Sequence, residues 1–527
     1  MKTLFYGGKI LTMSDPMYAG GVLVEDGKIT WISPQSPLPL GEKDCTYVDL
    51  QGAVMLPGFV DAHSHFFQVA TSMLQVSLNG ARSPEEMGQR IRDYIAREKV
   101  QPGEWVIARD YDHNLLPQYQ HPTLEQLNGF APENPLIIHH KSGHMGLMNQ
   151  KALDLLEITP ETPDPEGGKI GREDGKLTGY LEENAFIAAI KRAPMPGGET
   201  LLQGFQKAQN LYASMGITTV QDGMVVKEML PVYQQLLERK LLQLEVVLYC
   251  APEAYAAARA MVEAQGENCP VRVGGMKIFL DGSPQGRTAW LRQPYAGEAE
   301  YRGYGTMTDE QVEEAFLLAA RNNTQLLAHC NGDAAVEQFL RCLENAQRQQ
   351  PNLAALRPVI IHGQLMGKDQ MEQASRLGAM VSFFVAHVYH WGDVHIRNLG
   401  MERAEGISPV ASALRAGIPV TFHQDAPVIP PDMLETVWCA VARRTESGVL
   451  LGEEERISTQ EALECVTKNG AYQYFQEDQK GKIAEGMTAD LVILSQDPLT
   501  TPTQQLREIQ VLQTYKNGHC VYARQEN

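Results

Sequence analysis

The sequence predicts an α/β protein built on a (β/α)8 barrel of the TIM type, with a small β-sandwich domain and a long insertion after the first barrel strand. Three observations support this fold class. The chain has 527 residues, which suits one large barrel with a satellite domain. Eight apolar, strand-like runs alternate with helical stretches through its middle. Short β-like runs separated by glycine-containing turns lie near both of its ends.

The first β-like runs are KTLFYGGKILTM, AGGVLVEDGKITWI and QGAVMLPGFV. Similar runs return near the other end of the chain, in GKIAEGMTADLVILS and VLQTYKNGHCVYA. Both groups show alternating or clustered apolar residues over strand lengths. We therefore expect residues 1–55 and 476–527 to build one β-sandwich, with the barrel over residues 56–475.

The barrel prediction depends on a count of buried-type strands. The runs are LPGFVDAHSH, GITTVQDG, LEVVLYC, GGMKIFLDG, QLLAHC, RPVIIHGQ, AMVSFFVAH and IPVTFHQDAP. Helical stretches such as MTDEQVEEAFLLAARNN and MGKDQMEQASRLG fall where crossover helices belong. Eight parallel strands are the number that a closed barrel of this type requires.

The gap between the first and second runs is far longer than one helix. It spans residues 66–215, is rich in Pro, Gly, Trp and Tyr, and contains one more β-like run, PLIIHH. Long connections of this kind usually carry function or form a subdomain. We expect an inserted subdomain that folds over the barrel mouth.

Composition excludes several classes of protein. The formal net charge is -19, and no long block of lysines or arginines occurs, which argues against nucleic acid or an anionic membrane as a partner. The first residues lack the apolar core of a signal peptide, and no stretch approaches about 18 uninterrupted apolar residues. The eight cysteines are scattered without a C-x-x-C pair. We expect a cytoplasmic protein with reduced thiols.

The run GFVDAHSHF carries the first candidate metal ligands, His63 and His65. Residues two apart on a strand point to the same face, so both imidazoles can bind one metal ion. The pattern alone fits two loop histidines equally well. Later strand-like runs end in His329, His362 and Asp425. Because active sites of such barrels lie at the carboxyl ends of the strands, we expect these side chains to converge.

Lys277 lies among apolar residues in GGMKIFLDG. Burial disfavours the charged ammonium and lowers the pKa of a lysine. A neutral amine can react with carbon dioxide to give a carbamate, an anion able to bridge two metal ions. The alternative is a lysine that reaches the strand end or pairs with Asp281.

The pattern H-x-H, Lys, His, His, Asp resembles that of the amidohydrolase superfamily. KIFLDGSPQGRTAWL, AHCNGDAAV, RPVIIHGQL and HQDAPVIPPD are similar to segments of its subfamily of N-substituted formamide deformylase-like, metal-dependent hydrolases. GKIAEGMTADLVIL resembles the C-terminal sheet segment, so the resemblance covers essentially the whole chain. It implies one or two divalent metal ions, most often zinc. The first would be bound by His63, His65 and Asp425, the second by His329 and His362, with carboxylated Lys277 between them.

The resemblance also implies a reaction. A metal-activated hydroxide attacks a carbonyl carbon, and Asp425, the catalytic proton shuttle, delivers a proton to the leaving nitrogen. We expect cleavage of a C–N bond in a small-molecule amide or formamide. The alternatives are a deaminase, another hydrolase or isomerase on the same site, and a non-catalytic regulatory protein with this fold. A homodimer is the default assembly for barrels of this size.

Further residues are candidates for contact with the substrate. His423 precedes Asp425 by two positions, so it shares its strand face. In the seventh run, FFVAHVYHWGDVH, His387 aligns best with a family histidine, and we expect His390 and His395 to be loop residues. In HHKSGHMGLMN the counterpart of another family histidine is His144, with Ser142 replacing an aspartate. The remaining candidates are Glu183 in TGYLEEN, Asp222, Asp281 and Arg287.

Overall fold

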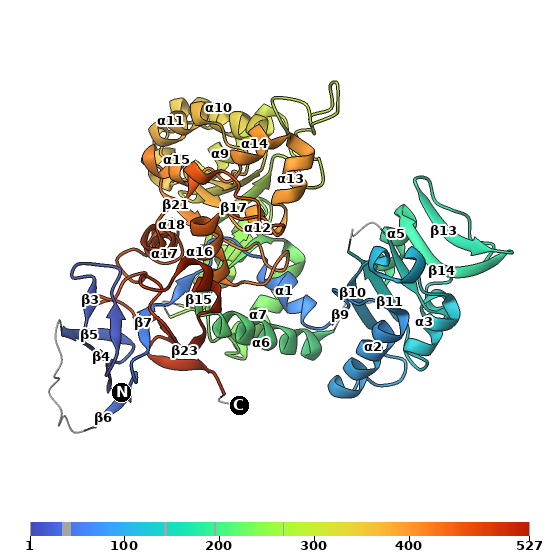
Figure 1. Ribbon diagram of the computed structural model, residues 1–527, viewed down its shortest axis with the longest axis horizontal. Coiled ribbons are helices and arrows are strands. Elements are labelled where there is room, and N and C mark those ends of the chain that lie inside the picture. Colours follow the sequence, from blue (N-terminus) through green and yellow to red (C-terminus); the bar gives the residue numbers. More distant parts are fainter. Residues whose placement is uncertain (1, 34–43, 142–144, 194–196, 267, 526–527) are drawn as a thin grey trace. The chain divides into compact units, whose positions relative to one another are not determined.

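The computed structural model describes residues 2–33, 44–141, 145–193, 197–266 and 268–525 (Figure 1). The chain forms two compact units. The first comprises Met1–Val69 and Gln206–Asn527, and the second Ala70–Phe205. Each unit is described by itself.

The first unit contains an eight-stranded parallel sheet in the order β21-β20-β19-β18-β17-β16-β15-β8. Its two edge strands approach each other at their carboxyl ends, where the His65 N–H donates to the Ala426 carbonyl across 2.9 Å. This confirms the predicted α/β, TIM-like fold. The strands are β8 (Phe59–Val60), β15 (Ile217–Val225), β16 (Glu245–Cys250), β17 (Val271–Phe279), β18 (Gln325–Cys330), β19 (Val359–His362), β20 (Met380–Phe383) and β21 (Val420–Phe422).

Helices connect and flank these strands (Figure 1). No helix in the described part of the chain is long and apolar enough to cross a membrane. The longer ones are α6 (Gly198–Ser214), α7 (Leu230–Glu238), α8 (Tyr255–Glu263), α9 (Asp309–Arg321), α10 (Asp333–Gln349), α11 (Lys368–Arg376), α13 (Gly392–Leu399) and α16 (Met433–Ala442). The shorter ones are α1 (Phe66–Ser72), α12 (His387–His390), α14 (Met401–Glu405), α15 (Val410–Arg415), α17 (Thr459–Cys465) and α18 (Lys468–Gln473).

Inward-facing apolar residues of the barrel strands form one buried cluster that includes Val247, Leu327 and Ile361. Leu327 lies two residues before His329 on the same strand, so both side chains share one face of the sheet. The strand period therefore places an apolar side chain in the middle of β18 and a histidine near its carboxyl end on the same face.

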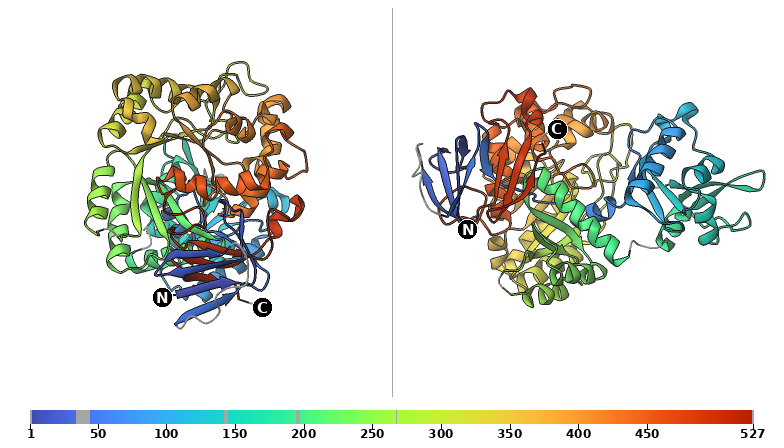
Figure 2. Two further views of the ribbon diagram at one scale, coloured as in Figure 1. Left: turned by 90° about the vertical axis from the view of Figure 1, so that its left-hand side faces the viewer. Right: turned by 90° about the horizontal axis from the view of Figure 1, so that it is seen from below.

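The segments near both chain ends build two further sheets, which lie side by side in Figure 2. They share one buried core, with Phe5 and Val22 from the first sheet and Met55 and Ile493 from the second. The first sheet contains β1 (Lys2–Tyr6), β4 (Gly21–Glu25), β5 (Lys28–Ser33) and β6 (Cys45–Asp49). The second contains β2 (Lys9–Leu11), β3 (Tyr18–Ala19), β7 (Val54–Pro57), β22 (Leu491–Leu494), β23 (Val511–Lys516) and β24 (His519–Ala523).

A buried ion cluster joins the amino end of the barrel to the C-terminal segments. Glu245, the first residue of β16, contacts both Lys480 and Lys516, the latter at 3.3 Å. The same two ammonium groups lie 3.5 and 2.7 Å from Asp490. Two positive and two negative side chains thus neutralise one another.

The second unit contains a six-stranded sheet in the order β13-β14-β12-β11-β10-β9. PLIIHH contains only one of these strands, so the insertion has more sheet than the sequence analysis found. Asp174 and Gly175, with φ of 50° and 75°, form the turn of the β13–β14 hairpin, and an Asp-Gly pair is a hairpin signal. The strands are β9 (Val76–Ser77), β10 (Val106–Tyr111), β11 (Leu136–His140), β12 (Met145–Met148), β13 (Gly168–Glu173) and β14 (Lys176–Glu183).

The helices of the second unit are α2 (Pro84–Glu98), α3 (Leu124–Phe130), α4 (Gln150–Leu155) and α5 (Asn184–Arg192). Apolar residues of these helices and of the sheet form two buried clusters, one around Ile91 and Ile138 and one around Leu153 and Phe186. The expectation that this unit covers the barrel mouth stays a prediction.

Candidate metal centre

His63, His65 and Asp425 come together at the carboxyl ends of the first and last barrel strands. One ligand atom from each lies within 4.8 Å of the other two. Asp425 Oδ1 is 3.4 Å from His63 Nε2 and 3.2 Å from His65 Nε2. Residues separated by more than 350 positions in the chain therefore form one group of metal-ligating atoms.

His329 and His362 lie on the other side of the same carboxylate. His329 Nδ1 and His362 Nε2 are 3.0 Å apart, and His362 Nε2 is 4.0 Å from Asp425 Oδ2. Asp425 thus directs one oxygen toward the H-x-H pair and the other toward His362. The two oxygens of Asp425 therefore lie beside members of both ligand groups that the family resemblance implies.

The backbone is strained where two of these side chains are presented. His362 and Asp425 have φ of 75° and 54°, in the left-handed region that favours glycine. Residues held in this conformation cluster at functional sites, where the surrounding structure stabilises them. Here the left-handed turn occurs at the end of β19 and just after β21.

Lys277 lies beside the histidines and has no exposed surface. Its Nζ is 3.1 Å from His63 Nε2. Burial lowers the pKa of Lys277 to about 7, although the nearby Asp425 carboxylate opposes this change. A neutral amine, the form that reacts with carbon dioxide, is therefore accessible near neutral pH.

Protein groups fix the orientation of the ligand rings. Gln221 donates from Nε2 to the Ala62 carbonyl, so its Oε1 accepts a hydrogen bond from His63 Nδ1 across 2.6 Å. His63 Nε2 is then unprotonated and directed toward Lys277 and Asp425. The Gly282 carbonyl accepts from His329 Nε2 across 3.0 Å, which leaves Nδ1 of His329 unprotonated as well. Such outer contacts select the tautomer of a metal-binding histidine.

His423 supports the ring of His362. Its Nε2 lies 3.1 Å from His362 Nδ1, and its Nδ1 lies 2.8 Å from Ser382 Oγ. His423 is fully buried, so its contacts are with these protein groups. The sequence analysis missed Gln221, Ser382 and the Gly282 carbonyl. The one available signal was a polar residue, Gln221, inside the buried run GITTVQDG.

The chemistry of these groups fits a divalent cation. Asp425 Oδ1 is buried and accepts no hydrogen bond from the described residues. Burial lowers the pKa of His63 and of His362 well below the usual value and that of His329 to about 4, so the imidazoles are neutral. Burial raises the pKa of Asp425, but His65 and the other histidines around it hold it well below its usual range. Neutral imidazoles and an unpaired carboxylate oxygen are ligands that zinc prefers.

Other predicted site residues have protein partners. Asp281 accepts hydrogen bonds from the backbone N–H groups of Trp290, Asn331 and Gly332 and so ties together the loops after β17 and β18. Asp222 accepts hydrogen bonds from the Tyr233 hydroxyl (2.5 Å) and the Phe67 N–H (3.3 Å). Asp281 Oδ1 also lies 3.6 Å from His329 Nε2, and Asp222 forms an isolated backbone bridge with His65, so both residues border the group of ligands.

Arg287 forms an ion pair of 2.8 Å with Glu298 at the surface. His387 Nδ1 lies 3.1 Å from His395 Nε2, and the two buried rings stack. His390 ends α12 and His395 belongs to α13, so the expectation of loop residues was wrong for both. Glu183 ends β14 in the second unit. His144 and Ser142 lie outside the described residues.

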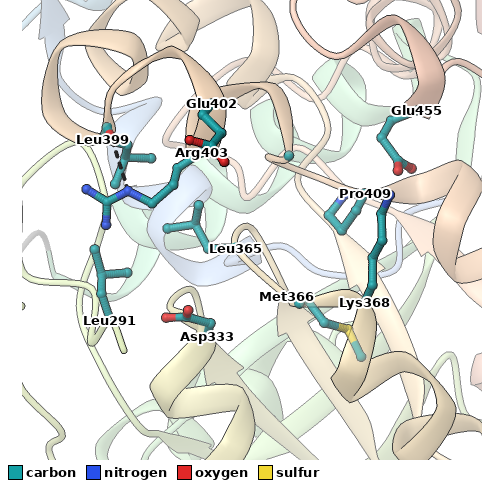
Figure 3. A pocket seen from close by; sticks show the side chains of 12 residues that line it. Leu291, Asp333, Leu365, Met366, Lys368, Leu399, Glu402, Arg403, Pro409 and Glu455 are labelled. Atoms are coloured by element: carbon teal, nitrogen blue, oxygen red, sulfur yellow. Dashed lines mark hydrogen bonds between the residues drawn. The ribbon is translucent and has the colours of Figure 1, made fainter. Parts of the chain in front are cut away.

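A cavity of about 220 Å³ lies among the loops and helices that follow β17, β18, β19 and β20 (Figure 3). Apolar side chains such as Leu291, Leu365 and Met366 line it together with the charged groups of Lys368 and Arg403. The ligand residues of the metal centre are not part of its lining.

A TIM-like barrel with histidine, lysine and aspartate side chains at its strand ends offers the ligands that a water-activating divalent metal ion needs. The profile of the Amidohydrolase family matches residues 46–522, and the chain belongs to this family. It is therefore a metal-dependent hydrolase of the amidohydrolase type, an enzyme that acts on carbon–nitrogen bonds.

Individual relatives agree with this assignment over nearly the whole chain. YtcJ of Bacillus subtilis, provisionally named an amidohydrolase, is 28% identical over 99% of this chain and 99% of its own. The N-substituted formamide deformylase of Arthrobacter pascens is 27% identical over 96% of this chain and 95% of its own. The crystal structure of an uncharacterized metal-dependent hydrolase from Pyrococcus furiosus superposes with a TM-score of 0.77 at 25% identity, covering 95% of this chain and 100% of that one.

Proposed function

We propose that this enzyme hydrolyses the C–N bond of linear N-substituted amides, with N-substituted formamides as the first class to test. The convergence of His63, His65, Lys277 and Asp425 at one end of the barrel carries the proposal. The choice of substrate class is supported by the similarity to the Arthrobacter pascens deformylase over 96% of the chain.

The described side chains divide the work of such a reaction. A divalent metal ion, which we propose to be zinc, would supply Lewis-acid activation of the substrate carbonyl and of water. His63, His65 and Asp425 would bind it. Gln221 would keep His63 in the tautomer whose Nε2 is free to coordinate, because its Oε1 accepts from the opposite nitrogen.

Asp425 also moves the proton in this proposal. Its Oδ1 faces His63 and His65 while Oδ2 faces His362, so one oxygen can hold a cation while the other accepts a proton. Delivery of this proton to the leaving nitrogen releases an amine. Carboxylation of Lys277 would replace a cation beside His63 by an anion, which favours the binding of a second metal ion by His329 and His362.

The test is a product assay with purified enzyme that has been loaded with zinc. N-substituted formamides should yield equal amounts of formate and amine, and a chelator should abolish the reaction. Asp425→Asn should lower kcat by at least about 100-fold, because it removes both a ligand and the proton acceptor. Asp369→Asn, at an exposed carboxylate on α11, is the matched control and should retain activity.

Two outcomes would contradict the proposal. One is full activity of Asp425→Asn. The other is the absence of turnover on linear amides and formamides together with release of ammonia from ring substrates, which would favour the deaminase alternative on the same centre.

A further inference from the structure

The second unit contains a separate group of metal-ligating side chains, formed by Asp112, His113 and His140. Their ligand atoms lie within 4.8 Å of one another. His113 Nδ1 is 3.0 Å from His140 Nε2, which is 3.8 Å from Asp112 Oδ1. The group shares no residue with the centre in the barrel.

These separations match a coordination sphere. Metal–ligand bonds of about 2.0–2.2 Å in a tetrahedral zinc site place neighbouring ligand atoms about 3.4 Å apart. The two observed separations of 3.0 and 3.8 Å lie on either side of that value. A hydrogen bond between the two histidines would explain the shorter separation alone. Asp112 Oδ1 also accepts hydrogen bonds from the N–H and Nδ2 of Asn114, at 2.9 and 2.8 Å, which hold it beside the same nitrogen.

The backbone brings the three side chains together through an irregularity in the sheet. The pairing of β10 with β11 shifts register between Ala108 and Tyr111, and the register then places Tyr111 opposite His140. Asp110, within the shift, has φ of 67°, a strained value for a residue with a side chain. β-Bulges commonly redirect side chains next to functional sites. Here the irregularity immediately precedes Asp112 and His113.

Charge and surroundings also suit a cation. Burial lowers the pKa of His140, and the neighbouring His113 lowers it further. Burial raises the pKa of Asp112, but hydrogen bonds from Asn114 and the two histidine charges hold it below the usual value. The Asp112 carboxylate gives the group one negative charge. This charge partly neutralises a divalent ion.

Aromatic rings form one side of this group. The ring of Tyr111 meets His140 edge-on with centroids 5.0 Å apart, and His121 packs on His113 at 4.6 Å. The Tyr111 hydroxyl lies 3.1 Å from His121 Nδ1 and holds that ring against the group. Three protein ligands in a tetrahedral arrangement leave one position for water or a small anion.

We propose that Asp112, His113 and His140 form a second metal site in the inserted unit, which takes a borderline divalent cation such as Zn²⁺ or Co²⁺. This site goes beyond the proposed amide hydrolysis and does not depend on it. A metal ion bound there would connect the turn after β10 to the end of β11.

The experiment counts bound metal in the full-length protein. The chain is stripped with a chelator and titrated with Co²⁺, and the bound metal is measured by equilibrium dialysis and by the visible absorption of the cobalt ion. His113→Gln and His140→Gln should each bind one ion fewer per chain than the unaltered protein. His139→Gln is the matched control, because His139 lies on the same strand but packs against Phe186. It should retain the full count.

Two further variants distinguish loss of this site from misfolding and from loss of the barrel centre. Asp112→Asn keeps a good cap for the turn that follows it but removes the ligand charge, so it should fold normally and weaken binding by on the order of 10-fold or more. His63→Ala combined with His65→Ala impairs the barrel centre, and the ion that depends on His113 should remain. Equal cobalt counts in His113→Gln, His140→Gln and His139→Gln would overturn the proposal, whatever the activity of the enzyme.

Discussion

Replacing Glu245 by Gln tests whether the buried ion cluster holds the barrel to the C-terminal sheet segments. Glu245 Oε2 contacts the ammonium groups of both Lys480 and Lys516, and Oε1 accepts a hydrogen bond of 2.7 Å from Gln476. The substitution keeps the size of the side chain but replaces one acceptor oxygen by an amide group that donates. It leaves two buried ammonium groups opposite one carboxylate, that of Asp490.

The expected loss of stability follows from the distances between the Glu245 carboxylate and the two ammonium groups. At about 3 Å and an effective dielectric constant of about 20, each attraction contributes about 5 kcal/mol. Glutamine is uncharged and costs less to bury than the carboxylate, which offsets part of this loss. Removing one partner of a buried ion pair costs about 3–5 kcal/mol in free energy of unfolding, and we expect a value in this range.

The assay is urea denaturation combined with amide hydrogen exchange of peptides from β15, β16 and β23, which report on the first unit. Glu263→Gln is the matched control, because Glu263 pairs with Arg259 on an exposed helix face at 2.6 Å. The control substitution should lower the free energy of unfolding by less than about 0.5 kcal/mol. Metal content should not change in either variant, because Glu245 lies at the opposite strand end from the ligands. A loss of unfolding free energy in Glu245→Gln within about 1 kcal/mol of that in the control would refute this reasoning.

The remaining predictions concern pH and the metal centre. Burial raises the pKa of Glu245, but Lys480 and Lys516 hold it well below the usual value, so its stabilisation is present above about pH 4.3 and is lost as pH falls below it. Urea midpoints between pH 6 and 3 should fall more steeply for the native protein than for Glu245→Gln, and parallel curves would contradict this. His423→Phe removes the partner of His362 Nδ1 and should weaken metal binding by about 10–100-fold in competition with a chelator. The buried control His395→Phe should bind normally, and equal affinities of the two variants would exclude this role for His423.

The local part of the fold was readable from the sequence. Parallel barrel strands are buried on both faces, so they appear as short apolar runs, and the eight runs correspond to β8 and β15 to β21. The two-residue period of a strand predicts that His63 and His65 share a face, and the structure brings both to Asp425. The β13–β14 hairpin had a turn signal, Asp174-Gly175, that could have been used.

Contacts between distant segments were not readable in this way. The sequence contains Gln221 and Lys480 as ordinary polar residues, and only strand register and packing place them beside His63 and Glu245. The same applies to His113 and His140, which meet because a register shift in β10 changes the direction of the chain. Sequence patterns report the periodicity of one segment, whereas these contacts depend on how segments align. The sequence by itself thus determined the family, the barrel and the ligand types, and the tertiary structure decided which polar groups orient those ligands.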